Sequence, residues 1–278
     1  KINKLLLLDL CYENEIKNIK EIEKFAQVLV IDHHQNSIDI NSKKTTCILT
    51  EKQTPTTLAC YKLFSKIQNL EKLDFLVAIA ILNDYCFKEN TEFLSEIESK
   101  YNLKKSSSIR DSEIWNLMEL LNKGIIYFKD DLKKCYNTLK EIKQPADIKK
   151  FEKYSKEIDK EIEIIEKDFN KNKEVYPWGY FYFRNFQPKF QLSSLIATSL
   201  SEKEPDKLFI LAHLSKILYV RINARNQSCK YNCAELLRKA VLGLEGGNAG
   251  GHIPAAGAEI MKKDLDKFKA SLLKILGK

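Results

Sequence analysis

Two short apolar runs that each end in aspartate constrain the fold of this chain most strongly. Residues 5–10 read LLLLDL and residues 28–32 read VLVID, with a polar, Glu- and Lys-rich stretch at 13–25 between them. Unbroken apolar runs are typical of parallel strands buried on both faces, and a helix usually connects two such strands. The pattern therefore predicts a parallel strand–helix–strand unit with Asp9 and Asp32 at the carboxyl ends of neighbouring strands.

The rest of the chain divides into segments with different patterns. Segment 55–84 is typical of two helices, and segment 90–173 carries dense charge with Ile and Leu at helical spacing. Aromatic and strand-like runs return near residue 175, which indicates a second α/β domain. We expect an α/β protein with three parts: a parallel-sheet domain at 1–100, a helical connector at 101–174 and a smaller C-terminal α/β domain at 175–278.

Composition excludes several classes of protein. A chain of 278 residues that is 44% hydrophobic is long and apolar enough for two cores, which argues against wholesale disorder. The apolar run at 75–82 is far shorter than the roughly 18 residues of a membrane span, so no membrane association is expected. The seven cysteines form no CxxC pair, which predicts reduced thiols, a cytoplasmic location and no zinc cage.

Positive charge is concentrated in the C-terminal third. Residues 177–278 hold 16 Lys and Arg against 8 Asp and Glu, which accounts for the whole net charge of +8. Such a basic segment favours an anionic partner, and nucleic acid is the commonest one. The alternative is that the lysines only keep the surface soluble.

Two of the four histidines are adjacent, and they directly follow the second apolar run. His33 and His34 stand next to Asp32 at the end of that strand, where α/β folds place chemistry. Asp9 lies one strand upstream, and Asp84 follows a later apolar run. Imidazole and carboxylate together suit Mn²⁺, Zn²⁺ or Fe²⁺, and a carboxylate-rich site favours Mn²⁺ or Mg²⁺. The alternative is a solvated loop that binds no metal.

A third histidine, His252, lies in the glycine-rich segment GGNAGGHIPAAG. Five of the nine glycines of the chain fall within twelve residues there, at positions 246, 247, 250, 251 and 257. Glycines permit turns that point backbone N–H groups at an anion, and Arg221 and Arg225 upstream could clamp a phosphate. The alternative is a glycine-rich hairpin with a purely structural role. The segment matches neither the P-loop nor the dinucleotide-binding fingerprint.

The order of these motifs is similar to that of a known family. VLVIDHH, with LLLLDL upstream and AIAILND downstream, resembles the DHH phosphoesterase superfamily. GGHIPAAG resembles the signature of the DHH-associated C-terminal domain, and ILYVRINAR is typical of archaeal RecJ-like nucleases. The resemblance covers nearly the whole chain. It implies two domains with the active site in the cleft between them.

The resemblance also implies roles for the residues of the first domain. Asp9 matches a carboxylate that bridges two metal ions, and His33 and Asp84 match ligands of one of them. Asp32 matches a buried residue that steadies the histidines, and His34 matches a residue beside the metal and the scissile phosphate. We therefore expect two Mn²⁺ or Mg²⁺ ions in the complete site.

In the second domain, the resemblance assigns substrate binding. Arg225 and His252, with Gly250 and Gly251, match positions that hold the substrate phosphate or the terminal nucleotide. Arg221 is a further candidate for the same phosphate.

One departure from the family concerns its first motif, a strand with an HxDxD-like set of ligands. That strand should precede Asp9 by several tens of residues, but only eight residues precede it here. Three explanations stay open: a truncated chain, a strand supplied by a second polypeptide, and a degenerate relative without activity. The sequence predicts that a neighbouring strand pairs with residues 5–8 in the working protein.

The expected function is that of a RecJ-like exonuclease that hydrolyses single-stranded DNA or RNA to mononucleotides by two-metal catalysis. One alternative is a phosphatase of the same superfamily that acts on short oligoribonucleotides or nucleoside bisphosphates. Others are one subunit of a split nuclease, and a non-catalytic partner of replication-fork proteins.

Overall fold

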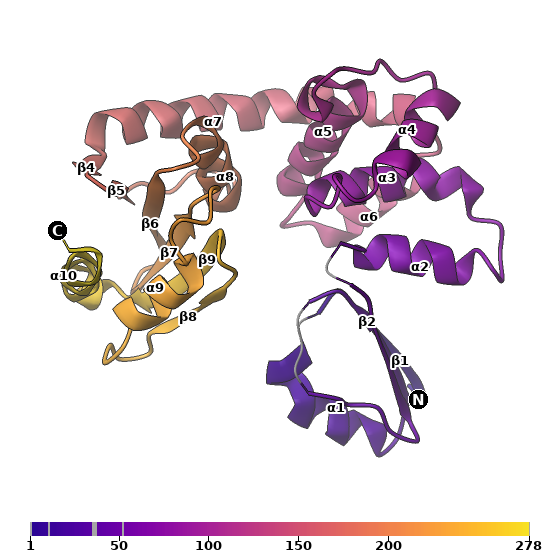
Figure 1. Cartoon of the computed structure of the whole chain (residues 1–278), viewed down its shortest axis with the longest axis horizontal. Helices are drawn as coiled ribbons and strands as arrows, with labels where there is room; N and C mark the ends of the chain where they lie inside the picture. Colours follow the sequence, from indigo (N-terminus) through magenta and orange to yellow (C-terminus); the bar gives the residue numbers. More distant parts are fainter. Residues whose placement is uncertain (1, 11, 35–37, 52, 278) are drawn as a thin grey trace. The chain divides into compact units, whose positions relative to one another are not determined.

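The computed structural model describes residues 2–10, 12–34, 38–51 and 53–277 (Figure 1). The packing of the backbone divides the chain into two compact units, Lys1–Glu152 and Lys153–Lys278. Among the described residues, the first unit holds a three-stranded sheet and the second a six-stranded sheet. Predicted segment 101–174 is helical, and its helices divide between the two units.

The first unit begins with alternating strands and helices and continues with helices alone. In chain order its elements are β1 (Lys4–Leu8), η1 (Tyr12–Glu15), α1 (Ile16–Glu23), β2 (Gln27–Asp32), β3 (Thr45–Leu49), α2 (Thr56–Phe64), η2 (Glu71–Leu73), α3 (Asp74–Asn83), α4 (Thr91–Lys100), η3 (Ile109–Asp111), α5 (Glu113–Tyr127), α6 (Leu132–Lys140) and η4 (Pro145–Phe151).

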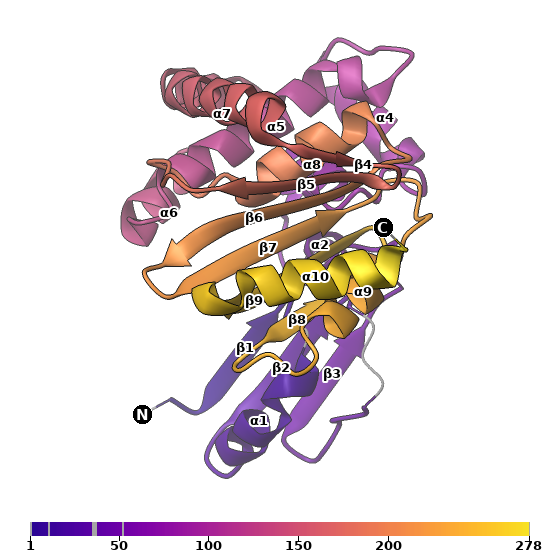
Figure 2. The same cartoon turned by 90° about the vertical axis from the view of Figure 1, so that its left-hand side faces the viewer.

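The sheet of the first unit is parallel, with β2 in the centre. β2 pairs with β1 on one side and with β3 on the other, both in parallel register (Figure 2). The predicted strand–helix–strand unit is therefore confirmed, whereas β3, with the sequence TTCIL, was not predicted. Every second residue of β1 lies exposed, with Leu6 at 48% and Leu8 at 45%, although the strand is as apolar as β2. Among the described strands β1 is thus an edge strand with an uncovered apolar face.

Helix α3 precedes Asp84, one of the predicted metal ligands. Its sequence DFLVAIAILN is apolar on all sides, which is typical of a helix buried all round, and seven of its ten residues are buried. It contacts α2, α4 and α5 and ends at Asn83, so that Asp84 is its C-cap. The two helices predicted for segment 55–84 are confirmed as α2 and α3.

The second unit begins with a long helix and then forms a mixed sheet. Its elements are α7 (Glu152–Asn172), β4 (Glu174–Tyr176), β5 (Gly179–Arg184), α8 (Ser193–Lys203), β6 (Leu208–Lys216), β7 (Tyr219–Arg225), α9 (Cys233–Ala240), β8 (Asn248–Gly251), β9 (Ala255–Met261), η5 (Lys262–Asp264) and α10 (Leu265–Leu276).

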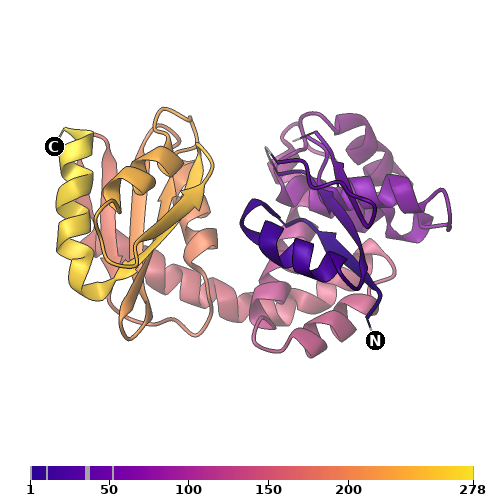
Figure 3. The same cartoon turned by 90° about the horizontal axis from the view of Figure 1, so that it is seen from below.

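The six strands of the second unit lie in the order β4-β5-β6-β7-β9-β8. Only β5 and β6 are parallel, and α8 is the crossover between them. Helices α9 and α10 cover one face of the sheet and α8 lies on the other (Figures 1 and 3). Apolar side chains from alternate strand positions, such as Ile210, Ile222 and Ile260, form the core beneath α9 and α10.

Two expectations about composition can be compared with the structure. The six cysteines that the structure describes are all free thiols, while Cys11 lies outside the described residues. Within the described part of the chain, no helix has the length and apolarity needed to span a bilayer.

Candidate functional site

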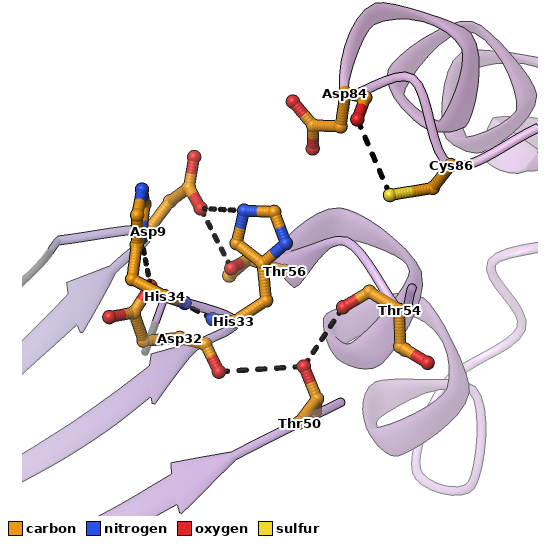
Figure 4. A network of polar contacts seen from close by, with 9 residues as sticks. All are labelled: Asp9, Asp32, His33, His34, Thr50, Thr54, Thr56, Asp84 and Cys86. Carbon is orange, nitrogen blue, oxygen red and sulfur yellow. Dashed lines mark hydrogen bonds and ion pairs between the residues drawn. The ribbon is translucent and has the colours of Figure 1, made fainter. Parts of the chain in front are cut away.

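The carboxyl ends of β1 and β2 bring Asp9 beside the adjacent histidines (Figure 4). Asp9 follows β1 directly, and its amide donates to the carbonyl of Ile31 at 3.1 Å, which extends the parallel pairing by one residue. The backbone of Asp9 has φ 57°, in the left-handed region that residues other than glycine seldom adopt. Such strained positions concentrate at functional sites, because surrounding contacts must hold them.

Three candidate metal ligands converge at this edge. Asp9, His33 and His34 each offer one donor atom, and these atoms all lie within 4.8 Å of one another. His33 Nε2 lies 3.3 Å from Asp9 Oδ1. The same Asp9 Oδ1 accepts a hydrogen bond of 2.9 Å from the hydroxyl of Thr56, the first residue of α2. Thr56 is 4% exposed, so its hydroxyl holds the Asp9 carboxylate from the protein side.

Asp32 orients the two histidines by accepting hydrogen bonds from them. Its side chain is fully buried, and Oδ1 accepts from the amide of His33 at 2.9 Å and from that of His34 at 3.3 Å. The same oxygen lies 2.7 Å from His34 Nδ1. An Nδ1–H donated to this carboxylate places the imidazole lone pair on Nε2, the atom that a histidine offers to a cation. Asp32 is thus placed to orient both histidines, and the supporting role that the resemblance implies for it stays a prediction.

Asp84 approaches the same edge from the end of α3. Figure 4 shows its carboxylate directed toward Asp9 and His33. It does not belong to the group whose donor atoms lie within 4.8 Å of one another. Burial raises the pKa of the Asp84 carboxyl; the Asp9 carboxylate adds to this rise, while the two histidines oppose it. The next residue, Tyr85, has φ 56°, so a second strained backbone position borders this edge. We call Asp9, His33, His34 and Asp84, with Asp32 behind them, the metal edge.

The donors of the metal edge fit a divalent cation. Carboxylate oxygen and imidazole nitrogen are the ligands that Mn²⁺ and related ions take in proteins. His33 Nδ1 is buried and has no hydrogen-bond partner among the described residues. The nitrogen of His33 that faces Asp9 is Nε2, so Nε2 is the atom that this ring would offer to an ion, with Nδ1 as its N–H on the protein side.

The glycine-rich segment of the second unit forms a hairpin, β8–β9. Gly250 pairs with Gly257 across the two strands, and a side chain at Gly250 would meet open space. Strand β7 lies next to β9 and carries Arg221, Asn223 and Arg225 at alternate positions on one face. We call the residues of this face, together with the β8–β9 hairpin, the hairpin face. A groove of about 360 Å³ runs along it, and its lining includes Arg221, Asn223, Asn248, Gly250, Gly257 and Glu259.

The predicted substrate residues take different places on the hairpin face. Arg221 and Gly250 line the groove, and Arg221 Nε pairs with Glu259 at 2.9 Å. Gly251 has φ 136°, and a Cβ there would lie 2.6 Å from the carbonyl oxygen of Ala255, so only glycine fits this turn. His252 is exposed, and its amide donates to the same carbonyl of Ala255 at 2.8 Å.

The side chain of Arg225 points toward α8, whereas that of Arg221 pairs with Glu259. Arg225 Nη2 donates to Ser194 Oγ at 3.1 Å, and its Nε lies 3.5 Å from Thr198 Oγ1. The two arginines therefore have different partners, and the predicted joint clamp on one phosphate stays a prediction.

Sequence reasoning missed several polar residues of these two regions. The sequence indicates Thr56 only weakly. Its position after Pro55 marks a helix start, but nothing local links it to Asp9, which lies 47 positions away. Asn223 sits two residues from each arginine in RINAR, so strand alternation would have found it. Ser194 comes next to β7 only through the crossover from β5 to β6, which no local pattern shows.

Comparisons with known proteins place this chain among proteins of related fold. Residues 180–278 match the family model of the DHHA1 domain. The DHH domain of a protein described as a member of a ribosomal-protein family is 16% identical, with a TM-score of 0.70 over 98% of this chain and 69% of that one. RecJ from Thermus thermophilus in complex with Mn²⁺ is also 16% identical, with a TM-score of 0.66 over 99% of this chain and 45% of that one.

A third similar structure is CDC45 from Entamoeba histolytica. It is 11% identical, with a TM-score of 0.54 over 99% of this chain and 83% of that one. No curated protein sequence matches the chain. At these identities the structural similarities establish the fold, and the chain spans less than half the length of RecJ.

Proposed function

We propose that this member of the DHH superfamily, with its RecJ-like fold and its C-terminal DHHA1 domain, is a metal-dependent phosphodiesterase. The observation that carries the proposal is the convergence of Asp9, His33 and His34 within 4.8 Å above the buried Asp32. The substrate that we infer is single-stranded DNA or RNA, hydrolysed from an end to mononucleotides as in a RecJ-like exonuclease.

Mn²⁺ or Mg²⁺ is the cofactor that this donor set suits best. Asp9, His33 and Asp84 would hold it, with His34 beside them, and Mn²⁺ is the ion in the RecJ complex of similar fold. Two such ions would stabilise the attacking and leaving oxygens of an in-line displacement at phosphorus. Thr56 fixes the Asp9 carboxylate and Asp32 fixes the His34 ring, so both side chains are oriented before a ligand binds.

Completion of the site by a strand beside β1 is part of the proposal. Leu6 and Leu8 are about half exposed, and β1 has no strand partner on its outer side among the described residues. Unpaired edges of apolar strands are aggregation liabilities, so an added strand would stabilise the sheet. We infer that this strand, from the same polypeptide or from a second one, also brings the remaining ligands.

Substrate binding falls to the DHHA1 domain in this proposal. The groove of the hairpin face offers the Arg221 guanidinium, two amide side chains and the bare backbone of Gly250 and Gly257. These groups suit a phosphodiester chain, since guanidinium and N–H groups donate to phosphate oxygens. The excess of positive charge in residues 177–278 favours the same partner.

Two other functions compete with the exonuclease. A phosphatase for short oligoribonucleotides or nucleoside bisphosphates would use the same metal edge, and the basic C-terminal third favours longer polymers over such substrates. A non-catalytic role at the replication fork is suggested by the fold shared with CDC45. The intact metal edge favours catalysis, because a purely structural protein has no need of converging ligands.

The test is hydrolysis of 5′-labelled and 3′-labelled 20-mers of DNA and RNA with Mn²⁺, by the chain together with the segment that pairs with β1. Release of mononucleotides is expected. A strong preference for dinucleotides over 20-mers would favour the small-substrate phosphatase. No hydrolysis with any divalent metal would contradict both enzymatic functions.

A further inference from the structure

The first turn of α8 lies at the carboxyl ends of the parallel strands β5 and β6. The helix begins at Ser193 and is eleven residues long, and its N-cap residue Leu192 has no side-chain acceptor. No acidic residue occupies the first turn. The amides at this helix start therefore have no side-chain cap from Leu192, and the helix dipole makes the position favourable for an anion.

Basic and hydroxyl side chains surround this helix start. Ser193 Oγ lies 3.0 Å from His213 Nε2, where His213 stands near the end of β6. In the sheet register His213 is flanked by Arg184 of β5 and Arg221 of β7. Ser194, the next residue of the helix, binds Arg225. Two hydroxyls and a row of basic groups thus lie together at one end of α8.

Arg184, in this row, has a buried nitrogen without a hydrogen-bond partner among the described residues. The residue is 4% exposed, and the nitrogen concerned is Nε. The carboxylates that influence it are engaged elsewhere: Glu161 accepts from two backbone amides of the loop before α8, and Asp168 accepts from the Tyr182 hydroxyl. A buried guanidinium N–H without an acceptor is costly, so an oxygen acceptor that reached Arg184 Nε would offset that cost.

The neutral state of His213 follows from its burial beside two arginines. Burial lowers the pKa of His213 to about 4, and the positive charges of Arg184 and Arg221 add to the effect. At neutral pH the imidazole therefore donates one N–H without adding charge to the row.

We propose that Ser193 and the first turn of α8, with His213 beside them and Arg184 behind them, form a binding site for one phosphate group of the polynucleotide. The inference rests on the proposed function, and it adds a phosphate contact outside the groove of the hairpin face. Hydroxyl, imidazole and helix-start N–H groups all donate to phosphate oxygens, and Arg184 supplies positive charge from the protein side.

The test is NMR of the histidine side chains, because the chain has only four histidines. The probes are a 5′-phosphorylated tetrathymidylate and, separately, inorganic phosphate, added to metal-free protein. His213→Asn assigns the His213 signal. We expect the His213 signal to shift progressively and saturate as the oligonucleotide is added. Ser193→Ala should weaken binding by about 10-fold or more, as for the loss of a hydrogen bond to a charged group.

Ser199→Ala is the matched control. Ser199 lies on the same helix, but its hydroxyl faces Glu166 of α7 at 3.4 Å, so this variant should bind like the wild type. Equal losses in the Ser193 and Ser199 variants would overturn the inference.

The other outcomes separate this inference from the proposed function. A shift at His252 with none at His213 would confine binding to the hairpin face, which overturns the new site and leaves the proposed function standing. A shift of the His213 signal by inorganic phosphate but not by the oligonucleotide would overturn the assignment to a polynucleotide. The last outcome is that the oligonucleotide shifts neither histidine signal and that its own fluorescence anisotropy does not change when protein is added. That outcome would contradict both the new site and the proposed function.

Discussion

In the first unit the candidate site consists of carboxylates and imidazoles, whereas in the second it consists of guanidinium groups, hydroxyls and exposed backbone. The metal edge is positioned by hydrogen bonds such as those from Thr56 to Asp9 and from His34 to Asp32. The hairpin face is shaped by glycines, since Gly251 adopts a turn that no other residue fits. The metal edge should therefore lose function when a charge is removed, and the hairpin face when a side chain is added.

The largest expected effect comes from Asp9→Asn. The amide keeps the volume and can still accept from Thr56, but it removes the negative charge that the proposed metal site offers to a divalent cation. Loss of a residue that only orients a ligand already costs about 10- to 100-fold, so we expect a fall of about 100-fold or more in Mn²⁺ affinity and turnover. Calorimetric titration with Mn²⁺ measures the affinity.

The control for this variant is Asp39→Asn in the same unit. Asp39 is an exposed carboxylate that accepts from Asn41 and takes no part in the metal edge. Mn²⁺ affinity that falls equally in both variants would show that general charge, rather than the metal edge, attracts the ion.

A smaller loss is expected from Thr56→Val, which keeps the shape of the side chain and removes its hydroxyl. The Asp9 carboxylate would lose the donor that fixes its orientation, so Mn²⁺ affinity should fall by about 10-fold. Thr56→Ser restores the hydroxyl and should restore the affinity. Equal affinities of the valine and serine variants, measured by Mn²⁺ electron paramagnetic resonance, would refute this positioning role.

Two adjacent glycines allow a matched test of the hairpin face. Gly251→Ala places a Cβ 2.6 Å from backbone atoms at φ 136°, so it should destabilise the second unit by at least about 2 kcal/mol. Gly250→Ala meets open space and should leave stability nearly unchanged. Denaturant unfolding followed by the fluorescence of Trp178, in a Trp115→Phe background, reports on this unit. Similar losses in both variants would contradict the observed hairpin.

A pH dependence of stability is expected from His213. Its pKa is lowered to about 4, from about 6.5 in an unfolded chain, so the unfolded state binds the proton first as pH falls. The contribution of neutral His213 is complete above pH 6.5 and declines as pH falls toward 4. Between pH 7 and 5 the wild type should lose up to about 2 kcal/mol more than His213→Asn. Equal losses in urea unfolding would refute the assignment.

The sequence predicted the metal edge better than it predicted the hairpin face. Asp9 and the histidines follow apolar runs, and two such runs joined by a helical stretch are the pattern typical of parallel strands. Strand β3 was missed because its apolar run is short and follows two threonines, with no helix between it and β2 to mark a parallel connection. Ser193 and Arg184 were missed for a related reason, because only the crossover topology places them near His213.

The most direct test of the account measures Mn²⁺ binding and single-stranded DNA binding in the His33→Ala and His252→Ala variants. The division of labour predicts that His33→Ala weakens Mn²⁺ binding at least 10-fold, while metal-free binding of a 5′-phosphorylated tetrathymidylate stays unchanged. His252→Ala should do the reverse, with weaker oligonucleotide binding and an unchanged Mn²⁺ isotherm. Loss of Mn²⁺ binding in the His252 variant, or its retention in the His33 variant, would contradict the account.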